Sequence, residues 1–114
     1  MSVKLNTRQI GDVTVIDVAG RITPGEGSGV MRDAVRDQTT RGSRKILLNL
    51  KDVSYINSSG IGELVAGYTS VANVGGMLKL LGLTKRTQEL LQVTRLYAVF
   101  EVYDDEAQAV RSFA

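Results

Sequence analysis

The 114-residue chain is 43% hydrophobic and 23% charged, a composition typical of one soluble globular domain. It contains neither cysteine nor histidine, which excludes disulfides, thiolate metal sites and a Ser-His-Asp triad. Fourteen Lys and Arg against twelve Asp and Glu leave a formal charge of only +2. The basic residues are interspersed along the chain. We interpret the two densest groups as solvated ends of secondary-structure elements: Arg41, Arg44 and Lys45, and then Lys85 and Arg86. We therefore predict no nucleic-acid partner.

The chain also lacks the pattern of an exported or membrane-spanning protein. No apolar stretch approaches the roughly 20 residues that a membrane span needs. Residues 1–8 are polar and alternating, unlike a signal peptide. We expect a cytoplasmic protein with no membrane partner.

The N-terminal residues predict a β-hairpin. Alternating apolar and polar residues over 3–6 predict a short half-exposed strand, and β-branched residues over 13–19 predict a second one. Gly11 and Asp12 lie between them and predict a tight antiparallel turn, in which Gly11 supplies the positive φ.

A loop, a helix and a buried strand are expected next. Glycines and the only proline mark 20–29 as a loop, and the following helix should end near Thr40, before Gly42. The continuous apolar run over 46–50 predicts a central strand covered on both faces. The apolar face of the helix should consist of Val30, Met31, Ala34 and Val35.

The second half of the chain predicts alternating helices and strands. A second helix should end at Gly75 and Gly76, and strands are expected over 77–81 and 99–103. Thr84 can cap a third helix, and the carboxylates of 104–106 suit the start of a final one. The predicted apolar faces are Ile61, Leu64, Val65, Tyr68 and Ala72 in the second helix, Leu90, Leu91 and Val93 in the third, and Ala107, Val110 and Ala114 in the last.

This order of elements predicts a single α/β domain over residues 1–114. Its mixed sheet should have about five strands, with an N-terminal hairpin, parallel crossovers and four helices. Ligands of such sheets bind outside the carboxyl ends of the strands. Function is therefore expected on the loop over 20–29 and on the segment between Leu50 and Ile61.

That second segment contains Asn57-Ser58-Ser59-Gly60 at the expected start of a helix. A serine there has two possible roles: it can cap the helix, or it can accept a phosphate that the helix dipole favours. Two adjacent serines compete for one cap position, so at least one hydroxyl is spare. Gly60 and Gly62 are unexpected in the first turns of a helix. They indicate either close packing or a surface that a partner can approach.

These residues resemble a known family signature. The buried strand over 46–50, followed by Asn57-Ser58-Ser59-Gly60-Ile61-Gly62, is similar to the motif of STAS-domain anti-sigma-factor antagonists. Gly20-Arg21-Ile22 resembles the element that precedes the family's first helix, and Gly76 with Leu78-Lys79-Leu80 resembles its later strand. The element order agrees across nearly the whole chain.

The resemblance implies a bacterial partner-switching protein with a STAS-like fold and no enzymatic activity or cofactor of its own. The unmodified form would bind an anti-sigma factor that is also a serine kinase, and so release a sigma factor. Phosphorylation of Ser58 would end this binding, and a serine/threonine phosphatase would reverse it. Partner contacts are expected at Thr23 and at the motif residues Asn57, Ser58, Ser59, Gly60, Ile61 and Gly62. A monomer or weak dimer is expected.

The sequence departs from the family pattern at two positions. The acid of the motif is Asn57 here, so the carboxylate beside the acceptor serine is lost, although asparagine caps helices as well as aspartate does. The aspartate that often follows the Gly-Arg-Ile element is Thr23. An alternative is therefore a STAS-like scaffold or docking module that is never phosphorylated.

Two further alternatives come from other functional classes. A nucleotide- or small-molecule-binding module could use the glycines over 25–29, but these lack the pattern of a P-loop or dinucleotide fingerprint. A hydrolase with Ser58 or Ser59 as nucleophile would have no histidine, and the Gly-x-Ser-x-Gly elbow is absent.

Overall fold

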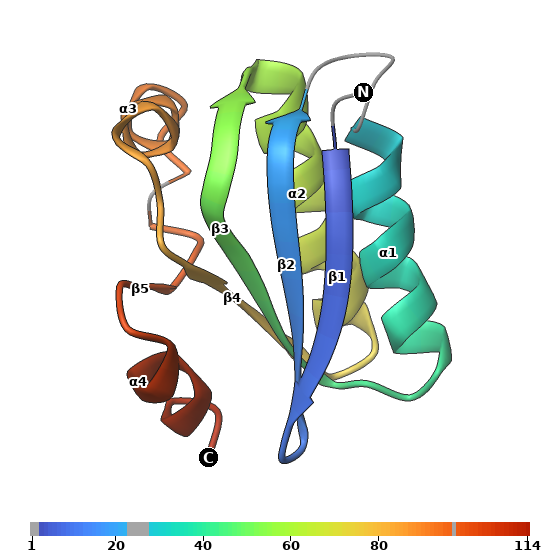
Figure 1. Cartoon of the computed structure of the whole chain (residues 1–114). Helices are drawn as coiled ribbons and strands as arrows, with labels where there is room; N and C mark the ends of the chain where they lie inside the picture. Colours follow the sequence, from blue (N-terminus) through green and yellow to red (C-terminus); the bar gives the residue numbers. More distant parts are fainter. Residues whose placement is uncertain (1–2, 23–27, 97) are drawn as a thin grey trace.

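A computed structural model describes residues 3–22, 28–96 and 98–114 (Figure 1). The predicted order of elements is confirmed. The elements are β1 (Val3–Ile10), β2 (Val13–Ile22), α1 (Ser28–Thr40), β3 (Lys45–Ile56), α2 (Ser58–Asn73), β4 (Met77–Leu81), α3 (Lys85–Val93), β5 (Val102–Tyr103) and α4 (Glu106–Arg111).

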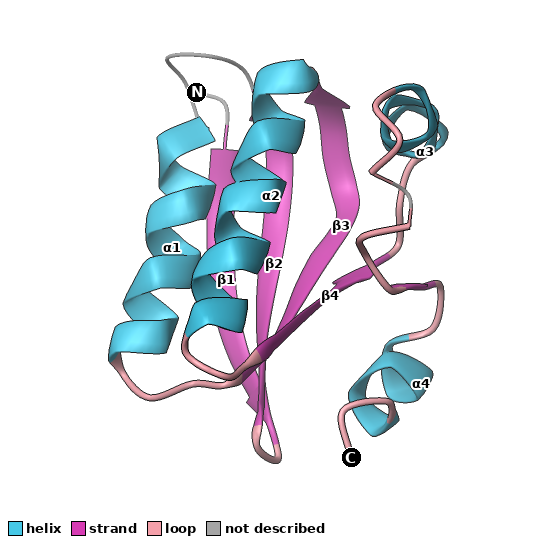
Figure 2. Ribbon diagram, turned by 180° about the vertical axis from the view of Figure 1, so that it is seen from behind, coloured by secondary structure: helices cyan, strands magenta, loops and turns pink. Residues whose placement is uncertain are grey.

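The strands form one mixed sheet in the order β1-β2-β3-β4-β5. β1 and β2 are antiparallel and meet at a tight turn in which Gly11 has φ of 62°, as predicted. The other neighbours are parallel and are joined by crossover helices. Figure 2 shows α1 and α2 side by side on one face of the sheet, while α3 and α4 lie toward the β4 and β5 edge. The predicted fold class is confirmed.

The main core lies between the sheet and the pair α1 and α2. It forms because alternate residues of each strand point to this face and meet the apolar stripes of both helices. Its fully buried members include Ile16 of β2, Leu48 of β3 and Leu64 of α2. The expected burial of β3 on both faces is also confirmed, because Leu47 points to the opposite face and joins a second, smaller core.

The second core holds the C-terminal segment against the sheet. It combines Val15 and Leu47 with Ala109 and Phe113. Lys79 of β4 is buried beneath this segment, where its ammonium donates to the Ser112 carbonyl at 2.9 Å and to the Ser112 hydroxyl at 3.0 Å. The short helix α4 therefore depends on tertiary contacts for its position.

Several strand boundaries differ from the predictions. β3 extends to Ile56 rather than ending at Leu50, and β2 extends to Ile22, because the two strands remain paired to their ends. Register shifts interrupt that ladder after Asp17 and after Gly20. The continuous apolar run on which the prediction relied ends at Leu50, because Lys51 and Asp52 follow it. β5 is shorter than predicted, since only Val102 and Tyr103 pair with β4.

Some predicted helix faces are also wrong. Val30 is 48% exposed and Val93 is 79% exposed, although both were assigned to apolar faces. In α4, Ala107 is exposed and Val110 only partly buried, while Ala109 faces the core. The helix ends at Arg111, so the chain turns inward there and buries Phe113 instead of the predicted Ala114.

Candidate partner-docking site

The predicted motif lies where two parallel strands end and a helix begins. Ile22 at the end of β2 pairs with Ile56 at the end of β3, and α2 starts two residues later at Ser58. Figure 1 shows these strand ends and the start of α2 at the same end of the molecule. Thr23, the other predicted contact, lies outside the described residues.

Asn57 caps α2, so neither serine does. Its backbone is extended, with φ of −114° and ψ of −173°, and its side-chain oxygen accepts from the Gly60 N–H at 3.1 Å. Ser58 and Ser59 therefore occupy the first two helical positions, where the backbone N–H groups have no acceptor within the helix. Both serines are exposed, and neither side chain hydrogen-bonds to a described residue. The capping interpretation of the serines is wrong, and both hydroxyls are spare, in agreement with the prediction that at least one would be.

The two glycines of the motif have different roles. A Cβ added at Gly60 would lie 2.5 Å from Ile56 Cγ1 and 2.9 Å from Ile22 Cγ2, so this position is glycine because the helix packs closely on the strand ends. At Gly62 a Cβ would meet nothing within 4 Å. Close packing therefore accounts for Gly60 alone, while Gly62 leaves an open surface.

The structure divides the predicted contact residues into two layers. Ser58, Ser59 and Gly62 are exposed, and Asn57 is half-buried by its cap. Gly60 is buried and Ile61 is only 1% exposed, which places both in the packing layer beneath that surface. Leu64, Val65 and Tyr68 belong to the core or pack against it, as expected.

A basic and aromatic cluster beside the motif was missed by the sequence analysis. The Arg21 guanidinium carbon lies 4.8 Å from the centre of the Tyr55 ring, and that of Arg86 lies 5.5 Å from it. The three residues come from β2, β3 and α3. Their proximity depends on the strand register, in which Arg21 pairs with Tyr55, and no local pattern reports it. Arg86 is an exposed residue at the start of α3, as predicted, and its contact with the Tyr55 ring is an addition that the sequence did not indicate.

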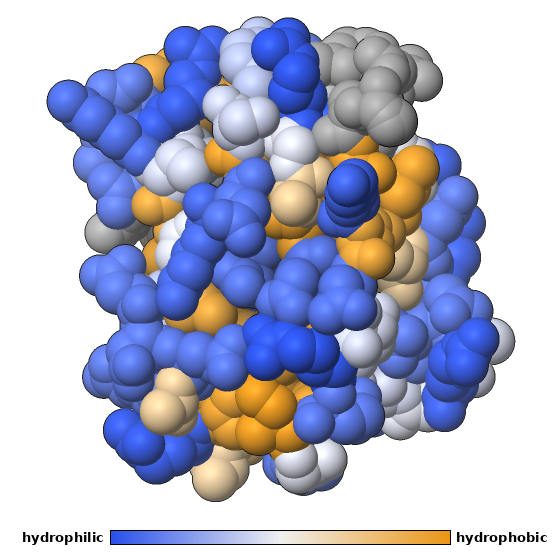
Figure 3. Space-filling view, in the orientation of Figure 1, coloured by the Kyte–Doolittle hydropathy of each residue, from blue (hydrophilic) through white to orange (hydrophobic). Residues whose placement is uncertain are grey.

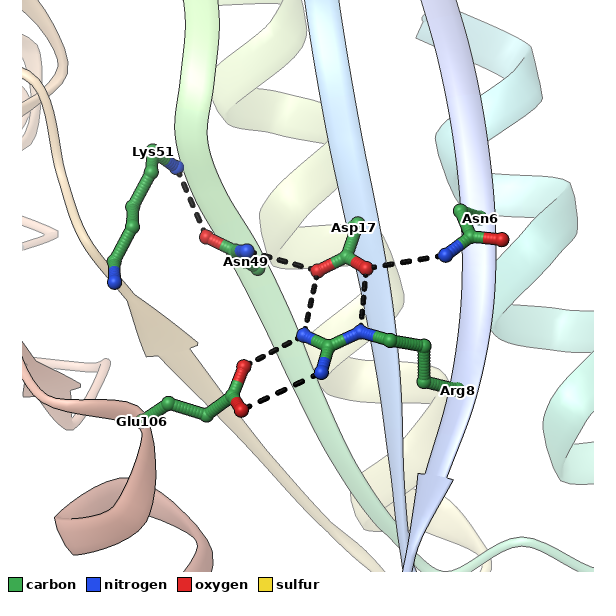
Figure 4. Close-up of polar contacts among 6 residues, drawn as sticks. All are labelled: Asn6, Arg8, Asp17, Asn49, Lys51 and Glu106. Carbon is green, nitrogen blue, oxygen red and sulfur yellow. Dashed lines mark hydrogen bonds and ion pairs between the residues drawn. The ribbon is translucent and has the colours of Figure 1, made fainter.

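A second polar cluster lies on the face of the sheet that α4 contacts (Figure 4). The Arg8 guanidinium donates to Asp17 at 2.7 and 2.9 Å and to Glu106 at 2.6 and 3.4 Å. Asn6 and Asn49 also donate to Asp17. These contacts lower the pKa of Asp17 to about 2, chiefly through the Arg8 hydrogen bonds, and lower that of Glu106 for the same reason. The cluster joins α4 to the sheet and leaves its charges paired.

The described residues provide no metal site and no helix long and apolar enough to cross a membrane. A hollow of about 100 Å³ lies between Tyr68, Met77 and Val99, beyond the C-terminal half of α2. A more open one is lined by Gln9, Arg44 and their neighbours. Neither of these two hollows is lined by a residue of the motif.

The fold, the motif and a match to a family model together identify the family of this chain. The five-stranded mixed sheet carries a serine-bearing helix start at the end of its central strand. The model of the STAS domain matches residues 4–109, and the chain belongs to that family.

Named relatives and solved structures agree with this assignment. A Thermotoga neapolitana protein is 36% identical to this chain over 70 residues, and it is named as a homologue of an anti-sigma factor antagonist. That alignment covers 61% of this chain and 62% of the relative, less than two thirds of its length. The anti-sigma-B factor antagonist of Bacillus subtilis is 28% identical over 102 residues, which cover 90% of this chain and 92% of that protein.

One solved structure shares the fold across the whole domain. The Bacillus cell fate determinant SpoIIAA, in its phosphorylated form, superposes with a TM-score of 0.76 at 18% identity. The superposition covers 97% of this chain and 100% of that one.

Proposed function

We propose that this chain is an anti-sigma-factor antagonist that works by phosphorylation-controlled partner switching in the bacterial cytoplasm. Its unmodified form binds an anti-sigma factor that is a serine kinase, so a sigma factor is released. The kinase phosphorylates Ser58 and thereby ends the complex, and a serine/threonine phosphatase resets it. The chain itself acts as a monomer or weak dimer without a cofactor and catalyses no reaction.

The observation that carries this proposal is the state of Ser58. It stands at the first position of α2, exposed, while the neighbouring Asn57 caps the helix. A kinase can therefore modify this hydroxyl without removing a hydrogen bond on which the fold depends. A phosphate there would face the positive end of a 16-residue helix, which favours anions. The phosphorylated form of SpoIIAA, a protein of the same fold, agrees with this use of the fold.

Phosphorylation can change binding at this surface without unfolding the protein. It would add about −1.5 to −2 charges to a surface that Gly62 leaves open to a partner's backbone. We expect the phosphomimetic Ser58→Asp to weaken partner binding while the melting temperature stays within a few degrees. The Thr69→Asp variant is the matched control, because that residue is also exposed on α2 but lies outside the predicted partner contacts.

The deciding experiment is intact-mass spectrometry after incubation with ATP and the serine-kinase anti-sigma factor encoded nearest in the source genome. Wild type, Ser58→Ala and Ser59→Ala run in parallel. We expect one phosphate on wild type and on Ser59→Ala, and none on Ser58→Ala. A phosphate on Ser58→Ala would contradict the assignment of the acceptor.

A second candidate is a docking module that is never phosphorylated. Asn57 favours it, since the family motif carries an acid at this position and the chain has none there. It predicts partner binding in a titration but no mass increase with ATP. In the Asn57→Asp variant, phosphorylation that wild type lacks would identify the missing carboxylate as the cause.

A further inference from the structure

Two arginines and a tyrosine from three separate elements meet at the end of the sheet that carries Ser58. The Tyr55 ring has the Arg21 guanidinium at 4.8 Å and the Arg86 guanidinium at 5.5 Å, both within the range of cation–π attraction. Tyr55 lies on β3, two residues before the helix cap Asn57. The ring thus holds two planar cations beside the start of α2.

The charge at this edge is not balanced by the described part of the chain. Lys85 and Arg86 form the first turn of α3, directly after its cap Thr84, and that turn contains no acidic residue. Cations there oppose the helix dipole. No ion pair joins Arg21, Lys85 or Arg86 to a carboxylate of the described residues, and all three side chains belong to exposed residues. Figure 3 shows a hydrophilic surface at the upper left, where Figure 1 places α3.

Three basic residues elsewhere in the fold contrast with this arrangement. Arg8 lies 2.7 Å from Asp17, Arg41 lies 2.9 Å from Asp37, and Lys45 lies 2.6 Å from Asp12. In each case the carboxylate belongs to the chain itself. At the Arg21, Tyr55 and Arg86 cluster an aromatic ring takes that position, which orients a guanidinium but does not neutralise it.

We propose that Arg21, Tyr55 and Arg86 form a second docking patch that receives aspartate or glutamate side chains of the protein that contacts Ser58. The inference rests on the proposed function and adds the chemistry of the partner's surface. Guanidinium groups bind carboxylates through two parallel hydrogen bonds when their planes are already oriented. Contact with the Tyr55 ring restricts both guanidiniums before the partner arrives, so less side-chain entropy is lost on binding.

The patch also gives phosphorylation an electrostatic means of release. Arg21, Lys85 and Arg86 carry three positive charges, and a phosphate on Ser58 adds about −1.5 to −2. The sum at this edge then falls to roughly +1, which weakens the attraction for an acidic partner. This attraction should weaken as the salt concentration increases, because the basic residues and the phosphate on Ser58 are exposed to solvent.

The test measures the affinity of the serine-kinase anti-sigma factor encoded nearest in the source genome by titration calorimetry at several salt concentrations. Wild type is compared with Arg21→Gln, Arg86→Gln and the control Arg111→Gln, an exposed arginine on α4. Figure 1 places α4 at the other end of the molecule from α3. We expect each of the first two variants to bind about tenfold more weakly, with a shallower salt dependence. The control should stay within about twofold of wild type on the same electrostatic argument.

Thermal denaturation separates docking from a purely structural role. If the cluster serves only to hold α3 on the sheet, Arg86→Gln will lower the melting temperature and leave affinity unchanged. Arg86→Lys keeps the charge and serves as a second variant if Arg86→Gln does not fold; it should retain most of the salt dependence. Wild-type affinity and salt slope in both glutamine variants would overturn this inference alone. No binding by wild type would overturn the proposed function, and this inference with it.

Discussion

The fold contains two arginine-bearing polar clusters that differ in how their charges are paired. In the Arg8, Asp17 and Glu106 network each charged group lies within hydrogen-bond distance of an opposite one. At the edge formed by Ser58, Arg21 and Arg86, the hydroxyl and the guanidiniums have no carboxylate partner among the described residues. The pairing of polar groups, rather than their number, therefore distinguishes the structural cluster from the proposed docking surface.

The difference follows from where each cluster lies. The Arg8 network sits where α4 covers the sheet, and it joins residues 98 positions apart in the chain. These charges are partly covered, so pairing offsets the desolvation that would otherwise oppose folding. The Ser58 edge lies outside the carboxyl ends of β2 and β3, where no described element covers it. Its hydroxyl and guanidinium groups are exposed to solvent and can contact a partner.

Removing the arginine of the network should give the largest loss of stability. Arg8→Met deletes four hydrogen bonds and leaves Asp17 and Glu106 facing each other. We expect the free energy of unfolding to fall by about 2–3 kcal/mol, since these bonds are charge-assisted but partly exposed. Urea denaturation measures the loss. Partner affinity should be unchanged, and a loss of affinity in the folded variant would contradict the division into two clusters.

Alanine substitutions at Gly60 and Gly62 of α2 test the packing beneath the proposed docking surface. Gly60→Ala brings a methyl group within 2.9 Å of both Ile56 and Ile22, whose side chains are fully buried. Overpacking of this kind should lower stability by about 2 kcal/mol. Gly62→Ala meets nothing within 4 Å, so helix propensity should raise stability by up to about 1 kcal/mol. Equal melting temperatures for the two variants would refute the assigned difference.

Lowering the pH should reduce the stability that the Arg8, Asp17 and Glu106 network contributes. Asp17 has a pKa of about 2 in the folded protein against an ordinary value of 3.8. Its depressed pKa contributes stability that is complete above about pH 5 and is lost as the pH falls through 4 toward 2. After allowance for solvent screening, we expect a loss of about 1–2 kcal/mol. Denaturation at stepwise pH measures it, and the slope should flatten in Asp17→Asn.

The smallest expected effect concerns the helix cap. Asn57→Ala removes the acceptor for the Gly60 N–H and should lower the free energy of unfolding by about 1 kcal/mol. Asn57→Asp keeps that acceptor and adds a negative charge at the helix start, so stability should stay within about 0.5 kcal/mol of wild type or rise slightly. A loss in Asn57→Asp as large as that in Asn57→Ala would rule out capping as the role of this side chain.

The sequence alone determined the features that depend on local patterns. The order of elements, the Gly11 turn, the strand over 77–81 and the Thr84 cap followed from periodicity, glycine conformations and capping preferences. The helix start at Asn57 to Gly60 was found in the same way, because polar residues before an apolar stripe form a local signal. Family membership also followed, since the motif is contiguous.

Only the tertiary structure decided which side chains are free and which are enclosed. The sequence could not choose between Asn57 and the serines as cap, because all three are good capping residues and the choice depends on where β3 ends. It could not separate Gly60 from Gly62, since the difference lies in contacts with Ile56 and Ile22. The Arg21, Tyr55 and Arg86 cluster depends on strand register and on the docking of α3, which no local pattern encodes.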